Sequence, residues 1–219
     1  MINYKCAIFD LDGTILDSTD VWNQIDLEFF AKRGMSMPED YGKTIAPMGF
    51  ERAAEYTVKT YNLSETPQEV VAEWNRMSHE KFENDVELKS GAKKYLEFLK
   101  ANGVVLCIAT ASQEDMFVPA LKNNGVFHLF DHITTLKEVK RGKGFPDIYL
   151  KAAQKAGFNV ADCVVFEDLL VGIKGAKDGG FYTIAVYDEN SKNDIEKIKI
   201  IADKLIYSFD ILIEKTDED

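Results

Sequence analysis

The alternation of short apolar runs with helix-length amphipathic segments constrains the fold of this chain more than any other feature of its sequence. Runs that are apolar toward both faces are typical of parallel strands covered by helices on both sides. The alternation therefore predicts an α/β fold with a doubly wound (Rossmann-like) parallel sheet. The expected strands are Tyr4–Phe9, Val104–Thr110, Cys163–Phe166 and Tyr182–Tyr187, with a less apolar candidate at His132–Thr135.

Two segments between these runs have the ends expected of crossover helices. Ser90–Asn102 carries apolar residues at helical spacing and stops before Gly103. Pro146–Ala156 begins with proline and stops before Gly157. Proline in the first helical turn and glycine just after the last turn are typical of helix ends. Both segments therefore support a repeating strand–helix–strand pattern.

The segment from Ser18 to Asp85 breaks this pattern, because it contains helical periodicity without a convincing strand. Thr66-Pro67-Gln68-Glu69 has the form of a capping box that opens a helix through Trp74. We therefore expect an α/β core made of residues 1–17 and 86–219, and a helical insertion at residues 18–85. The two tryptophans of the insertion, Trp22 and Trp74, are expected to pack rather than to line a substrate pocket.

The charge balance and the distribution of apolar residues narrow the choice of partners. The 219 residues include 37 acidic and 26 basic side chains, for a formal net charge of -11. Because this charge repels a phosphate backbone, we expect no nucleic-acid partner. No apolar stretch is long enough for a signal peptide or a membrane span, so we expect a cytoplasmic protein without a membrane partner. A monomer is expected, and the charged tail Glu214–Asp219 is expected to fray.

The segment Asp10-Leu11-Asp12-Gly13-Thr14 directly follows the first apolar run. Ligands bind at the carboxyl ends of the strands in open parallel sheets, and glycine permits the sharp turn that lets two carboxylates project together. Two acids so placed can divide the work of phosphoryl transfer, one attacking phosphorus and the other handling the proton of the leaving group. The alternative is an Asp- and Gly-rich turn of the kind that ends strands in any α/β protein.

Together with three later segments, this motif resembles the haloacid dehalogenase superfamily, whose first motif has the form DxDGT. Thr110-Ala111-Ser112 ends the second strong strand, where the family places a phosphoryl-binding Thr or Ser. Lys143 lies three residues before Pro146-Asp147, and Glu167-Asp168 ends another strand, as the family's lysine and acidic metal-binding motifs do. The helical insertion is similar to the cap of the subgroup that includes beta-phosphoglucomutase and phosphoglycolate phosphatase. The resemblance covers essentially the whole chain.

The resemblance implies a magnesium-dependent site with a role for each matched residue. Asp10 is the expected nucleophile, and Asp12 is the expected general acid and base. The phosphoryl group of the substrate is expected to bind Thr110, Ala111 and Lys143. The expected Mg²⁺ ligands are the carboxylates of Asp10 and Asp168 and the backbone carbonyl of Asp12, with Glu167 binding the ion directly or supporting a group that does.

The function implied by the resemblance is that of a phosphatase acting on a small phosphorylated metabolite, such as a sugar phosphate. A phosphomutase of the beta-phosphoglucomutase kind is the first alternative, although mutases carry a histidine where Trp22 stands. A catalytically silent binding or regulatory protein is the second alternative. The cap would close over the site and select the substrate.

The acidic run Asp188-Glu189-Asn190 follows the last strong strand and matches none of these motifs. Polar runs after strands are usually turns. We therefore expect this run to form a solvated loop.

Overall fold

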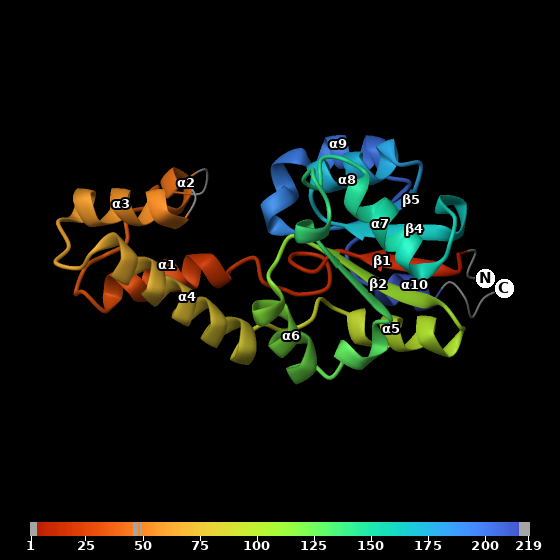
Figure 1. The fold of residues 1–219 in the computed structure, drawn as a ribbon, viewed down its shortest axis with the longest axis horizontal. Helices are drawn as coiled ribbons and strands as arrows, with labels where there is room; N and C mark the ends of the chain where they lie inside the picture. The colour runs from red at the N-terminus through yellow and green to blue at the C-terminus, as the bar shows by residue number, and fades with distance from the viewer. Residues whose placement is uncertain (1–3, 46–47, 49, 215–219) are drawn as a thin grey trace. The chain divides into compact units, whose positions relative to one another are not determined.

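The computed structural model describes residues 4–45, 48 and 50–214 of the chain, so most of the charged tail lies outside the described residues. The chain divides into two compact units (Figure 1), one formed by the residues up to Thr19 and from Val86 onward, the other by Asp20–Asp85. None of the helices in the described part of the chain combines the length and the apolar character that a membrane crossing requires.

The first unit is built on a six-stranded sheet in which all five neighbouring pairs are parallel. The strands lie in the order β3-β2-β1-β4-β5-β6, which is a doubly wound order. The predicted fold class is therefore confirmed. The strands are β1 (Cys6–Phe9), β2 (Val105–Thr110), β3 (His132–Thr135), β4 (Cys163–Glu167), β5 (Tyr182–Val186) and β6 (Lys204–Ile206).

Helices cover both faces of this sheet (Figure 1). On one face, Tyr149 packs with Cys6 and Val165 in a buried cluster. On the other face, Phe9 stacks on Phe166 with ring centroids 4.4 Å apart, and Phe209 lies 5.8 Å from Phe166. The helices of this unit are α5 (Ala92–Ala101), α6 (Glu114–Asn123), α7 (Asp147–Ala156), α8 (Leu170–Asp178), α9 (Ile195–Ile201) and α10 (Asp210–Glu214).

The second unit is helical, and aromatic side chains form its core. Phe30 makes edge contacts with Tyr41 and Tyr61, at centroid distances of 4.8 and 4.9 Å, while Phe29 packs on Trp74. Trp74 is buried, as expected, whereas Trp22 is 41% exposed. The helices are α1 (Val21–Ala31), α2 (Tyr41–Ile45), α3 (Phe50–Tyr61) and α4 (Pro67–Asn84).

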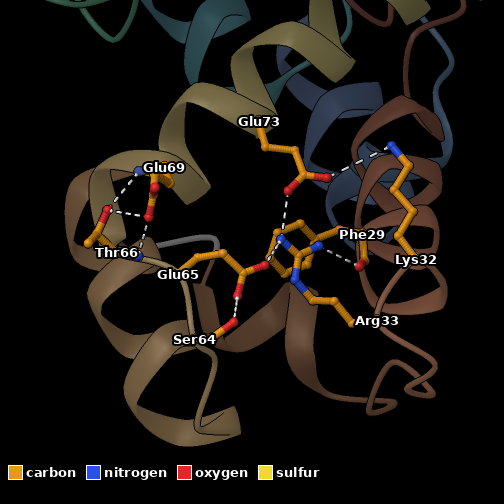
Figure 2. A network of polar contacts seen from close by, with 8 residues as sticks. All are labelled: Phe29, Lys32, Arg33, Ser64, Glu65, Thr66, Glu69 and Glu73. Carbon is orange, nitrogen blue, oxygen red and sulfur yellow. Dashed lines mark hydrogen bonds and ion pairs between the residues drawn. The ribbon is translucent and has the colours of Figure 1, made fainter.

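A polar network ties α1 to α4 and to the residues that precede α4 (Figure 2). The Arg33 guanidinium lies 2.7 Å from Glu65 and 2.6 Å from Glu73, and it sits over the ring of Phe29. Thr66 and Glu69 make the reciprocal hydrogen bonds of a capping box at the start of α4. The predicted start of this helix is therefore confirmed, and the helix continues ten residues beyond Trp74 to Asn84.

Candidate active site

The candidate site lies where the strand order of the sheet reverses, between the carboxyl ends of β1 and β4. Asp10 follows β1, and its backbone N–H donates to the carbonyl of Phe166 at 3.0 Å. This bond extends the β1–β4 pairing by one residue, so Asp10 is held beside Glu167 and Asp168 at the end of the neighbouring strand. Ligands bind at such a switch point in open α/β sheets.

Asp10, Glu167 and Asp168 form a buried acidic cluster, and one carboxylate oxygen from each lies within 4.8 Å of the others. The three residues are at most 6% exposed. Burial, opposed by Lys143, raises the pKa of Asp10 to about 7. Burial and the neighbouring carboxylates raise the pKa of Asp168 well above its ordinary value. Cation binding would favour the ionised forms of these acids, because it supplies the positive charge that burial has removed.

Lys143 provides the positive charge within this cluster. Its Nζ atom lies 2.6 Å from Glu167 Oε1 and forms an ion pair with Asp10. Burial lowers the pKa of Lys143, but the two carboxylates more than offset this effect, so the pKa of Lys143 is raised and the side chain stays charged. Tyr149 from α7 also donates a hydrogen bond to Glu167 Oε1, at 2.8 Å. Glu167 is therefore held by two donors from outside its own strand.

The turn after β1 requires glycine. Gly13 has a φ of +78°, and a Cβ at this position would lie 2.5 Å from Asp168 Oδ2. The adjacent Thr14 donates to Asp168 Oδ1 at 3.0 Å. The DxDGT motif thus folds back onto the acidic residues at the end of β4. Gly13 permits the close approach to Asp168, and Thr14 fixes the orientation of the Asp168 carboxylate.

Two serines hold the carboxylate of Asp12. Ser18 donates to Asp12 Oδ1 at 2.7 Å, and the Ser112 hydroxyl donates to Asp12 Oδ2. The structure therefore places the carboxylate of Asp12 beside the loop that follows β2. Thr110 ends β2 and is buried, and its hydroxyl accepts a hydrogen bond from the Ser112 N–H at 3.0 Å. Ala111, between them, is exposed.

Ser18, Ser112 and Tyr149 contact the site, but no role was predicted for them from the sequence. The only signal for Ser112 was its position two residues after Thr110 in the matched motif. Ser18 stood at the start of the predicted insertion, and Tyr149 stood in a predicted crossover helix, where a core position is the usual explanation. Their partners are 6, 100 and 18 residues away in the chain, so no local pattern identified them.

The prediction of a solvated loop at Asp188-Glu189-Asn190 is wrong for its first residue. Asp188 is only 1% exposed. Its carboxylate accepts from the Lys89 ammonium at 2.6 Å, from the Thr19 hydroxyl at 2.5 Å and from the Asn190 N–H at 2.9 Å. These donors outweigh burial, so the pKa of Asp188 is lowered.

Asp188 thereby joins the two segments that lead to and from the helical unit. Within the first unit these segments pair with each other, because the Asp17 N–H donates to the Glu87 carbonyl and the Lys89 N–H donates to the Ile15 carbonyl, both at 2.9 Å. Lys89 also forms an ion pair with Asp17 at 3.1 Å. Sequence reasoning could not find this cluster, because Lys89 and Asp188 are 99 residues apart.

The fold and the site together define a doubly wound α/β protein with a buried, oxygen-rich acidic cluster at its topological switch point. The sequence profile of the family described as haloacid dehalogenase-like hydrolase matches residues 7–186, a span that contains every predicted site residue. The chain therefore belongs to the haloacid dehalogenase-like hydrolase family, as predicted.

Individual relatives agree with this assignment. A Drosophila melanogaster protein named "Probable pseudouridine-5'-phosphatase" is 31% identical over 188 residues, which cover 83% of this chain and 81% of the relative. Hexitol phosphatase B of Escherichia coli strain K12 is 26% identical, with 86% of each chain covered. The solved structure of CbbY from Rhodobacter sphaeroides in complex with phosphate superposes with a TM-score of 0.72 at 22% identity, covering 94% of this chain and 95% of that chain, and it shows the shared fold.

Proposed function

We propose that this chain is a Mg²⁺-dependent phosphatase that hydrolyses a small phosphorylated metabolite through a phosphorylated Asp10. The observation that carries the proposal is the buried cluster of Asp10, Glu167 and Asp168, with Lys143 paired to two of its members. A nucleophilic carboxylate can approach an anionic phosphoryl group only where positive charge offsets the repulsion. The phosphatase names of the relatives support the same class of reaction.

The donor set of the cluster suits a hard cation. Carboxylate oxygens are the ligands that Mg²⁺ prefers, and three of them lie close enough to share one ion. Asp10, Asp168 and Glu167, with the backbone carbonyl of Asp12, would hold it. When bound, the ion supplies positive charge that offsets the acids and the phosphoryl oxygens.

In the first step, a carboxylate oxygen of Asp10 attacks phosphorus, and the bond from phosphorus to the ester oxygen breaks. Asp12 gives its proton to that leaving oxygen. Ser18 and Ser112 fix the direction in which the Asp12 carboxyl points. Lys143 and the hydroxyl of Thr110, with backbone N–H groups near Ala111, bind the phosphoryl oxygens.

In the second step, Asp12 is ionised and takes a proton from water. The resulting hydroxide attacks phosphorus, the bond from phosphorus to Asp10 breaks, and inorganic phosphate leaves. Asp10 then returns as a carboxylate and Asp12 as an acid, so the cycle balances. We propose that the predicted insertion at residues 18–85 serves as the cap of this enzyme. We place the protein in the cytoplasm as a monomer.

The proposal is tested by phosphate release from an alkyl phosphate and from 4-nitrophenyl phosphate, with Mg²⁺ or with EDTA. We expect turnover that EDTA abolishes. Asp12→Asn should slow the first step, measured as the initial release of the alcohol or of 4-nitrophenol, by roughly 100-fold or more for the alkyl ester and less for the aryl ester, because only the alkyl leaving group needs a proton. The second step should slow equally for both esters, because Asp12 acts there as the base.

Asp178→Asn is the matched control, since Asp178 is an exposed acid on α8 of the same unit. Its rates should equal those of the unaltered protein. Turnover that persists in EDTA, or an equal slowing of the first step for both esters in Asp12→Asn, would contradict the proposed chemistry.

A further inference from the structure

Asp188 is a buried acid of the first unit to which the proposed phosphatase mechanism gives no role. It stands shortly after β5 and is 1% exposed. Its carboxylate accepts from the Lys89 ammonium, the Thr19 hydroxyl and the Asn190 N–H. A buried ion pair adds little stability compared with apolar packing, and its best-known use is to fix one arrangement of the chain. Asp188 is therefore expected to hold a particular arrangement of the segments around it.

The segment that Asp188 contacts begins at Asp12, the proposed general acid. The turn at Gly13 approaches Asp188 so closely that a Cβ on this glycine would lie 3.3 Å from Asp188 Cγ. Farther along the same segment, the Thr19 hydroxyl donates to Asp188 Oδ2 at 2.5 Å. Asp188 therefore touches this segment both just after Asp12 and at Thr19.

Ser18 lies between two residues that this cluster holds. Before it, the Asp17 N–H donates to a backbone carbonyl of the neighbouring segment at 2.9 Å, and the Asp17 carboxylate forms an ion pair with Lys89 at 3.1 Å. After it, Thr19 donates to Asp188. All of these residues belong to the first unit, so the position of Ser18 is fixed from both sides within that unit.

Ser18 in turn directs the carboxyl group of Asp12. Ser18 is 4% exposed, and its hydroxyl donates to Asp12 Oδ1 at 2.7 Å. A general acid must hold its proton within hydrogen-bond reach of the leaving oxygen, so the direction of its carboxyl group affects the rate. Hydrogen bonds between oxygens extend to about 3 Å, so a shift of Ser18 by about 1 Å would release the Asp12 carboxyl.

We propose that Asp188 is a positioning residue for the general acid Asp12 and acts through Thr19 and Ser18. The inference rests on the proposed phosphatase function and adds a residue to its proton-transfer step. Asp188 holds Thr19, the held Thr19 keeps Ser18 in place, and Ser18 directs the Asp12 carboxyl. The ammonium of Lys89 provides the counter-charge of the buried Asp188 carboxylate.

The test is the dependence of the first step on the leaving group. This step is measured with Mg²⁺ as the initial release of an alcohol from an alkyl phosphate or of 4-nitrophenol from 4-nitrophenyl phosphate. Thr19→Val removes the donor to Asp188 but keeps the size of the side chain and the ion pair between Lys89 and Asp188. It should slow the alkyl ester by roughly tenfold, the size of one lost hydrogen bond, and leave the aryl ester within about twofold. Thr19→Ser restores the donor and should recover the alkyl rate.

Asp188→Ala removes the acceptor and should produce the same selective loss. Adding Thr19→Val to it should slow the alkyl ester no further, because the two residues share one hydrogen bond. Asp178→Asn, at an exposed acid of the same unit, is the control and should change neither rate. If Asp188→Ala does not fold, Thr19→Val decides alone, since it keeps the buried ion pair.

Equal slowing of both esters in Thr19→Val would mean that the cluster is merely structural and would overturn the inference. An unchanged alkyl rate in Thr19→Val, or a Thr19→Ser variant that is equally slow, would also overturn it.

If the unaltered protein hydrolyses no ester, or Asp12→Asn shows no selective loss, the proposed function fails. Crystal structures of the variants then decide whether Asp188 positions the Asp12 carboxyl. The Ser18 hydroxyl should lie beyond about 3.5 Å from Asp12 Oδ1 in Thr19→Val and within hydrogen-bond distance in Thr19→Ser. A hydrogen bond from Ser18 to Asp12 that persists in Thr19→Val would overturn the inference.

Discussion

The two units of this protein differ in whether their buried carboxyl groups have hydrogen-bond or ion-pair partners. In the sheet unit, Glu167 forms an ion pair with Lys143 and accepts a hydrogen bond from Tyr149. Asp168 accepts a hydrogen bond from Thr14, and Asp188 forms an ion pair with Lys89. In the helical unit, Asp26 is buried in a mostly apolar pocket without a described partner. The sheet unit therefore pairs its buried acids with hydrogen-bond donors and cations, whereas the helical unit holds a buried acid without a described partner.

The two kinds of buried acid suit different tasks, one catalysis and the other discrimination between ligands. A compensated acidic cluster can bind a cation and a phosphoryl group in a fixed geometry. An uncompensated acid in an apolar pocket discriminates between ligands, because any ligand without a suitable donor leaves it unsatisfied. Removal of the partner from the first kind of site should destabilise the fold, and neutralisation of the acid in the second kind should stabilise it.

Removal of Lys143 should produce the largest effect. Lys143→Met leaves Asp10 and Glu167 without a counter-charge, so we expect phosphate release to fall by roughly 1,000-fold. The free energy of unfolding should fall by about 3 kcal/mol in EDTA, the size typical of a broken buried ion pair, and by less in Mg²⁺. Phosphate assays and urea denaturation measure the two effects.

Lys174→Met is the control for this prediction, because Lys174 is exposed on α8 of the same unit. Its activity and stability should stay unchanged. A Lys143→Met protein as stable as the control would show that the acidic cluster does not depend on compensation by this lysine.

Loss of the charge of Asp188 should have the next largest effect. Asp188→Asn keeps the size of the side chain but leaves Lys89 with Asp17 alone, so the free energy of unfolding should fall by about 2 kcal/mol. The double variant with Lys89→Met should lose less free energy of unfolding than the sum of the losses in the two single variants, because the residues share one interaction. Urea denaturation of the cycle measures the coupling, with exposed Glu189→Gln as a control expected to stay within about 0.5 kcal/mol. Additive losses in the free energy of unfolding would mean that Lys89 and Asp188 are not coupled.

Neutralisation of Asp26 should have the opposite sign. The pKa of Asp26 is about 7 in the folded protein and 3.8 ordinarily, so between these pH values the folded chain holds a proton that the unfolded chain has lost. Its contribution to the free energy of unfolding therefore falls as pH rises through this window, by up to about 1.4 kcal/mol per pH unit. Because asparagine does not titrate, Asp26→Asn should gain stability relative to the unaltered protein from pH 5 to pH 7.

Urea denaturation at pH 5, 6 and 7 checks this prediction, with Asp40→Asn as the exposed control. Tyr41 is the titratable neighbour of Asp26, and it stays neutral throughout this range because burial raises its pKa further. A stability difference that does not change with pH would mean that Asp26 has a partner in the folded protein.

The smallest expected effect concerns an interaction that involves no buried charge. Thr66→Ala removes one half of the capping box at the start of α4 (Figure 2), so the free energy of unfolding of the chain should fall by about 1 kcal/mol. Thr66→Ser keeps the hydroxyl and should be nearly neutral. Equal losses in both variants would show that the methyl group of Thr66, rather than its hydrogen bond, stabilises the helix.

The sequence predicted those parts of the fold that depend on local patterns. Apolar runs located five of the six strands, and proline and glycine located the ends of two crossover helices. Strand β6 was missed because its three residues, Lys204–Ile206, lie at the edge of the sheet and form too short a run to show a period.

The candidate site was predictable to the extent that its residues stand at strand ends. Asp10, Glu167 and Asp168 converge because β1 and β4 are neighbours in the sheet, a consequence of the doubly wound order. Asp188 was misjudged because its partners come from the segments around Thr19 and Lys89, far away in the chain. The pocket around Asp26 could not be predicted, since it depends on how four helices without a motif pack together.

The proposed mechanism requires that Asp10 becomes phosphorylated. Acid quenching within milliseconds of mixing enzyme, Mg²⁺ and ³²P-labelled substrate would trap this intermediate. We predict label on the protein that borohydride reduction and mass spectrometry locate at Asp10, and no label in Asp10→Asn. Label at another residue, or phosphate release without any labelled protein at the earliest times, would contradict nucleophilic attack by Asp10.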